Sequence, residues 1–129
     1  EFNRDIRPIL SNHCFLCHGP DSKQRQAGLR LDLRDEALKP LESGATAIVP
    51  GDPARSHLLS RIESINPDEV MPPPASGKSL SPEQKAALRR WIEQGAAYQG
   101  HWAFLPPQRR EPPAAFRDGF SRNAIDQFI

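Results

Sequence analysis

The chain has 129 residues, of which 37% are hydrophobic, and its mean hydropathy is −0.62, so it can form one small domain with a modest core. Seventeen basic and 16 acidic residues leave a formal net charge of +1, which gives no support for a nucleic-acid partner or an anionic membrane surface. No apolar run approaches the roughly 18 residues of a membrane-spanning helix. The opening residues Glu1 and Phe2 lead directly into folded-looking sequence, with no recognisable signal peptide.

Short helices are predicted along the first hundred residues, because 14 prolines and eight glycines divide the chain and no β-alternation is sustained. The first helix covers about residues 3–11, where Asn3 or Asp5 can cap it and Pro8 favours the later start at Asp5. The apolar stripe of this first helix consists of Phe2, Ile6, Ile9 and Leu10. The second predicted helix is short and covers about residues 34–41.

Two further helices have clear start signals. The third begins at Gly51-Asp52-Pro53, with Asp52 as the cap and Pro53 as the first helical residue. The fourth begins at Ser81-Pro82-Glu83-Gln84, which combines a cap, a proline at the first position and a capping-box glutamine. The residues that these two helices should turn inward are Leu58, Leu59 and Ile62 in the third, and Leu88, Trp91, Ile92 and Gly95 in the fourth.

Residues 100–129 differ in composition, which predicts a domain at 1–99 followed by a proline-rich linker. This stretch lacks several of the backbone N–H donors that regular structure needs, because it contains Pro106, Pro107, Pro112 and Pro113. The last residues begin a new amphipathic pattern, with Ile125, Phe128 and Ile129 as its apolar positions, so we expect the natural protein to continue into a further domain. We expect Trp102 and Phe104 to anchor the first residues of this tail to the body.

Cys14-Phe15-Leu16-Cys17-His18 is the attachment signature of a c-type haem. Two thiols three positions apart lie on one turn of chain, so each can add to one vinyl group on the same porphyrin edge. His18, which follows directly, can then reach the iron. The alternatives are a thioredoxin-like pair without its βαβ context, a zinc site without a second cysteine pair, and a short-loop disulfide.

Met71 is the predicted second axial ligand. It is the only methionine, and the three prolines that follow it, residues 72–74, stiffen the loop around a weak thioether–iron bond. His101 is the main rival. His13 should point away from the iron, and His57 should lie at the surface or at the edge of a pocket.

Together these residues resemble the class I c-type cytochromes, and most closely the planctomycete cytochrome c domain at the N-terminus of large multidomain proteins. The resemblance covers nearly the whole chain. It implies an all-α fold of about four short helices around one covalent haem c, with the last helix crossing the first near Ile6 and Leu10. The motifs that carry it lie at residues 6–10, 17–21, 28–32, 49–53, 71–73, 88–92 and 101–104.

Other residues are expected near the haem. Leu29, Leu31, Ile48 and Val49 are apolar residues on loops, which suggests the wall of a pocket. Trp91 is expected mainly in the core, where haem contact is also compatible. Propionates need donors, for which Arg30 is the first choice, followed by Arg25, Tyr98 and Trp102.

The sequence therefore predicts a non-enzymatic electron carrier with His18/Met71 ligation, located in the periplasm. Its redox partner would be a separate protein or the C-terminal domains of its own parent chain. The alternative is a haem sensor or peroxidase-like domain with a labile sixth ligand, against which we note no recognisable acid–base pair outside the haem motif. A structural haem in a larger enzyme is a third possibility.

Overall fold

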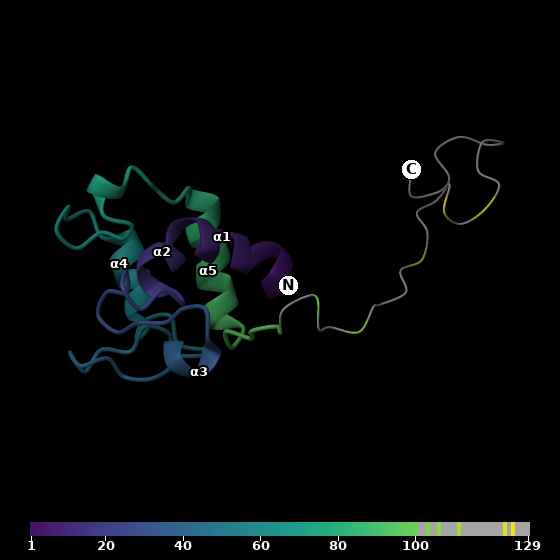
Figure 1. Ribbon diagram of the computed structural model, residues 1–129, viewed down its shortest axis with the longest axis horizontal. Coiled ribbons are helices and arrows are strands. Elements are labelled where there is room, and N and C mark those ends of the chain that lie inside the picture. The colour runs from purple at the N-terminus through teal and green to yellow at the C-terminus, as the bar shows by residue number, and fades with distance from the viewer. Residues whose placement is uncertain (101–102, 104–105, 107–110, 112–122, 124, 126–129) are drawn as a thin grey trace.

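In the computed structural model, short helices are joined by long loops (Figure 1). The structure describes residues 1–100, 103, 106, 111, 123 and 125. Predictions for His101, Trp102, Phe104, Phe128, Ile129 and prolines 107, 112 and 113 lie outside these residues. The α-helices within them are α1 (Arg7–His13), α2 (Phe15–His18), α3 (Arg34–Ala37), α4 (His57–Glu63) and α5 (Pro82–Glu93).

The helical class is confirmed. Within the described part of the chain there is no strand, and one isolated antiparallel bridge joins Pro40 to Thr46. Two further turns complete the architecture, a π-helical turn η1 at Phe2–Ile6 and a 3-10 turn η2 at Pro74–Ser76. The segments between the helices are long, so loops as well as helices must supply walls to any internal site.

The N-terminal helix is longer than predicted and changes its winding at Pro8. Pro8 occupies the second position of α1 and has no N–H to donate. The wider turn η1 precedes it, and its last hydrogen bond runs from the Arg7 N–H to the Phe2 carbonyl. Neither Asn3 nor Asp5 caps the helix, and helical structure begins at Phe2 without a side-chain cap. The predicted start at Asp5 is therefore wrong, because the π turn extends the helix past the proline.

The two middle helices are both shorter than predicted. The second ends at Ala37 and not near Leu41, because Pro40 disfavours helical backbone in the residue before it. The third begins at His57, and Asp52 instead closes a single turn by accepting a hydrogen bond from the Arg55 N–H at 3.0 Å.

A neighbouring segment explains the late start of α4. The N–H groups of His57 and Leu58, which have no partner inside the helix, donate to the carbonyls of Thr46 and Ala47 at 3.0 and 2.9 Å. The buried Ser56 hydroxyl donates to the Asp52 carbonyl at 2.8 Å and accepts from the Val49 N–H at 2.9 Å. The first turn of α4 is thus tied to residues 46–52.

The last helix begins as predicted but ends at Glu93, so the predicted inward residue Gly95 lies beyond it. Ser81 is the cap, and its hydroxyl accepts a hydrogen bond from the Gln84 N–H at 3.2 Å. The Gln84 side chain accepts one from the Ser81 N–H at 2.9 Å, which completes the capping box. Helix α5 packs against η1 and α4, and its Leu88, Trp91 and Ile92 are buried with Ile6 and Leu10.

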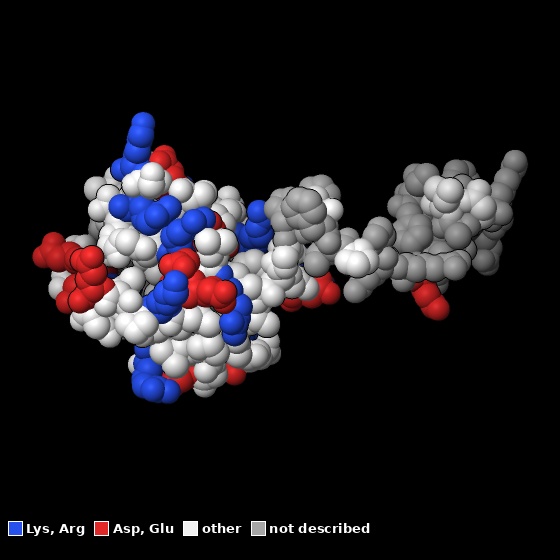
Figure 2. Space-filling model, turned by 60° about the horizontal axis from the view of Figure 1, so that its bottom comes forward, with Lys and Arg blue, Asp and Glu red and all other residues white. Residues whose placement is uncertain are grey.

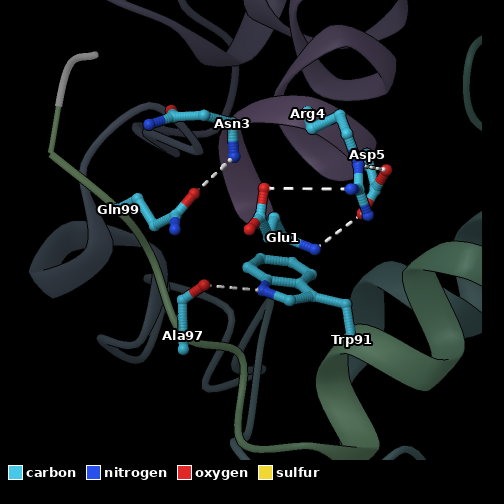
Figure 3. Close-up of polar contacts among 7 residues, drawn as sticks. All are labelled: Glu1, Asn3, Arg4, Asp5, Trp91, Ala97 and Gln99. Carbon is cyan, nitrogen blue, oxygen red and sulfur yellow. Dashed lines mark hydrogen bonds and ion pairs between the residues drawn. The ribbon is translucent and has the colours of Figure 1, made fainter. Parts of the chain in front are cut away.

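An aromatic cluster joins the two ends of the described body. The Trp91 ring lies 5.7 Å from Phe2 and 5.2 Å from Tyr98, and Phe2 lies 4.5 Å from Tyr98, measured between ring centroids. Figure 3 shows the polar contacts around it: the Trp91 indole donates to the Ala97 carbonyl at 2.9 Å, and the Asn3 N–H donates to the Gln99 side chain at 2.9 Å. The segment after α5 is therefore fixed to the N-terminal turn.

Replacement of Ser81 by Ala should lower the free energy of unfolding by about 1 kcal/mol, because it removes the acceptor for the Gln84 N–H. Denaturant unfolding monitored by far-UV circular dichroism measures this change. Ser11→Ala is the control, since Ser11 is an exposed serine inside α1 that caps no helix. Equal effects from both substitutions would contradict the role of the cap.

Candidate cofactor-binding site

A cavity of about 270 Å³ lies between α2, α4 and the loops that follow α2 and precede α4. Its lining includes the chemistry-bearing residues Cys14 and His18 of the motif and Met71, which lies far from them in the sequence. More than half of the lining residues are aliphatic, namely Ala27, Leu29, Leu31, Leu41, Ala47, Leu58 and Ile62. Such a wall suits a large apolar ligand that needs few polar contacts.

The cysteine–histidine motif forms the short helix α2, which the sequence analysis did not predict as a helix. The N–H groups of Cys17 and His18 both donate to the Cys14 carbonyl, at 3.1 and 2.8 Å. This single turn places the two cysteines on neighbouring positions of one helical surface. Both thiols are free, so the structure gives no support to a disulfide between them.

The loop after α2 is held to the motif by two main-chain hydrogen bonds. The Gln26 N–H donates to the Cys17 carbonyl, and the Leu31 N–H donates to the His18 carbonyl, both at 2.8 Å. These bonds return the loop to the cavity, where Leu29 and Leu31 line the wall as predicted from their apolar character.

Burial controls the protonation of the two motif residues that line the cavity. Desolvation raises the pKa of the Cys14 thiol to about 11, so the sulfur stays protonated at neutral pH. Desolvation also lowers the pKa of His18, against a smaller opposing effect from the backbone of Gln26. A neutral imidazole is the form that ligates a metal. Among the described residues the buried Nδ1 of His18 meets no hydrogen-bond partner.

Met71 reaches the cavity from the loop between α4 and α5 and is partly buried. Its N–H donates to the Arg61 carbonyl at 3.0 Å, so the backbone of the loop is anchored to the last turn of α4. The Met71–Pro72 peptide bond is cis. A thioether and an imidazole from distant parts of the sequence thus share one cavity.

Several predicted residues do not line this cavity. Arg30 forms an ion pair with Asp32, and its Nε donates to Asp32 Oδ1 at 3.0 Å. Trp91 belongs to the aromatic cluster described above. The remaining predicted residues outside the lining are Cys17, Ile48, which is buried in the core, and Val49.

The second choices for propionate donors have other partners as well. The Arg25 Nε donates to the Gly19 carbonyl at 3.1 Å, and the Tyr98 hydroxyl donates to the Leu31 carbonyl at 3.1 Å. Burial raises the pKa of Tyr98, so its hydroxyl remains a donor at neutral pH. Both side chains thus donate hydrogen bonds to backbone carbonyls in the segment that follows the motif.

The sequence analysis did not single out Arg61, whereas it expected His57 at the surface or at the edge of a pocket. His57 and Arg61 lie four residues apart on α4 and both reach the cavity. The sequence contained a signal for both residues, because positions 57 and 61 each lie directly before an inward residue of the same helix, Leu58 or Ile62.

The residues present fit a c-type haem. Apolar walls suit the porphyrin, a thiol lies beside it, nitrogen and sulfur donors suit iron, and Arg61 supplies a cation for an acidic substituent. Within the described residues no group of three or more His, Cys, Asp or Glu side chains could hold a metal ion. A zinc site built from protein ligands alone finds no support there.

Gly19, which follows the motif, is required by close packing. A Cβ atom at this position would lie 2.3 Å from the Phe15 carbonyl oxygen, far inside van der Waals contact. The obstacle is backbone of α2 itself, so it cannot move without distorting the motif. The sequence analysis assigned no such role to this glycine.

The surface carries charges of both signs. Figure 2 shows Lys and Arg side chains lying beside Asp and Glu on the face drawn, with no single sign covering it. Across the described residues, ion pairs such as Arg89 with Glu63 at 2.7 Å join the two signs directly. No helix in this part of the chain is long and apolar enough to cross a bilayer.

The helical fold and the cavity at its cysteine–histidine motif define a small cytochrome c domain. Residues 14–75 match the family model described as planctomycete cytochrome C, and this segment holds Cys14, Cys17, His18 and Met71. This match confirms, over that segment, the resemblance drawn from the sequence. Comparisons with curated proteins and with solved structures gave no match.

Gly19→Ala should destabilise the domain by about 1–3 kcal/mol, because the new methyl group forces the Phe15 carbonyl out of place. Thermal unfolding and the yield of haem-loaded protein measure the effect. Gly44→Asn is the control: nothing lies within 4 Å of a Cβ there, and Asn tolerates its positive φ of 80°. A neutral Gly19→Ala would show that the motif turn can shift freely.

Proposed function

We propose that this protein is an electron-transfer module that carries one haem c, attached through Cys14 and Cys17 and ligated by His18 and Met71. The observation that supports this proposal most strongly is the single cavity lined by Cys14, His18 and Met71 within an aliphatic wall. The match of residues 14–75 to a cytochrome c family model supports haem-based electron transfer in general.

The residues have separate roles in this proposal. The two thiols form thioether bonds that keep the cofactor in place, and the α2 turn sets their spacing. His18 ligates iron in its neutral form, which the apolar surroundings favour. Met71 supplies a soft sulfur ligand that favours the ferrous state. When bound, the haem supplies an iron that gains and loses one electron.

The lack of enzymatic activity, the cellular location and the domain organisation are also proposals. The module is not itself an enzyme, because two protein ligands leave iron no open position for a substrate. Haem attachment of this type is made outside the cytoplasm, which places the domain in the periplasm. We expect residues 1–99 to form the redox domain and residues 100–129 to lead to the domains that exchange electrons with it.

A second function is favoured by one observation. His57 and Arg61 both line the cavity, and a histidine near a cation could take part in proton transfer there. If Met71 were displaced, this pair would suit a sensor or peroxidase-like site. Ligand binding to iron distinguishes the two functions.

The haem should remain with the polypeptide after denaturation and acidic organic extraction, because two thioether bonds hold it. Intact mass spectrometry should find one haem for each chain. Cys14→Ser and Cys17→Ser together should give protein whose colour is extractable or absent. Extractable colour in the unsubstituted protein would contradict covalent attachment.

Met71→Ala should abolish the weak red charge-transfer band of the ferric protein and lower the reduction potential, because the sulfur ligand is lost. Visible spectroscopy and potentiometric titration measure both changes. The unsubstituted protein should bind carbon monoxide and cyanide slowly at neutral pH. Rapid binding, or substantial peroxide turnover, would instead favour the sensor or peroxidase-like function.

A further inference from the structure

The loop that carries Met71 makes two hydrogen bonds to one residue of α4, Arg61. Arg61 accepts the Met71 N–H at its backbone carbonyl, at 3.0 Å, and its guanidinium Nη1 donates to the Glu69 carbonyl at 3.2 Å. Arg61 is therefore hydrogen-bonded to the loop at two points two residues apart, one through its backbone and one through its side chain.

The rest of this loop has mainly local support. The N–H groups of Glu69 and Val70 donate to the Asn66 carbonyl at 3.0 and 2.9 Å, and the Ser64 hydroxyl contacts the Glu69 carboxylate at 3.3 Å. Ile65 is fully exposed, and the residues between it and Val70 are exposed as well. With so little buried surface, the loop depends on hydrogen bonds for its position.

The same arginine lines the cofactor cavity. It stands in the last turn of α4, one position before the buried Ile62, so packing fixes its backbone while its side chain spans from the cavity to the loop. A substitution of the Arg61 side chain should therefore displace Met71 more than it displaces the residues of the core.

We propose that Arg61 is a positioning residue for Met71: its guanidinium holds the 64–71 segment closed through the Glu69 carbonyl and so keeps the methionine at the cavity wall. This proposal rests on the proposed function in that it takes Met71 as the residue whose position matters to the cofactor.

The test measures loop opening in the haem-loaded protein by two methods. Arg61→Gln should speed amide hydrogen exchange at Met71 about tenfold, and should speed cyanide binding to the ferric protein by a similar factor, because a charge-assisted hydrogen bond is lost. Arg61→Lys should restore part of both, since lysine keeps a cationic donor. Arg55→Gln is the matched control, because it removes an exposed arginine paired with Asp52 outside the loop.

Three outcomes would overturn the proposal. A lower potential in Arg61→Gln with unchanged exchange and cyanide binding would mean that only the charge acts on the haem. Faster exchange throughout α4, with a lower melting temperature, would mean a general structural role. Equal effects in Arg55→Gln would mean a general charge effect. A missing red band in the unsubstituted protein would overturn Met71 ligation, while exchange at the Met71 amide would still decide the role of Arg61.

Discussion

The structure depends on one constraint, which is that a small protein must maintain an apolar cavity beside its core. Leu31, Ala47, Leu58 and Ile62 are buried, and each also lines the cavity. The elements that supply its walls are also held from outside the cavity. Main-chain hydrogen bonds and helix packing on the opposite side provide that support.

Those supports connect the cavity to distant parts of the chain. The loop after α2 is bonded to the Cys17 and His18 carbonyls, and α4 begins on the carbonyls of Thr46 and Ala47. Helix α5 does not line the cavity, but it packs on η1 and α4 and so stabilises the elements that do. Mutations far from the motif can thus change the site through backbone position.

The charged groups at the cavity connect its structure with its redox chemistry. Arg61 and His57 are the side chains there that can carry a positive charge apart from His18, and both come from α4. A cation near the iron of the proposed haem would favour its reduced state. The position of α4 therefore bears on both the proposed electron carrier and its sensor-like alternative.

The sequence by itself determined what depends on local chemistry. The spacing of Cys14, Cys17 and His18, the capping box at Ser81 and the apolar stripe of the first helix follow from residues close in the chain, and short-range rules describe them well. The family and the helical class followed from such motifs.

Only the tertiary structure decided which residues meet. Asp52 looked like a helix cap, but the hydrogen bonds from His57 and Leu58 to residues 46 and 47 set the start of α4 four residues later than predicted. Arg30 looked available to a ligand, but it is paired with Asp32, whereas Arg61 reaches the cavity. Contacts between distant segments leave no periodic pattern in the sequence, so propensity and spacing could not place them.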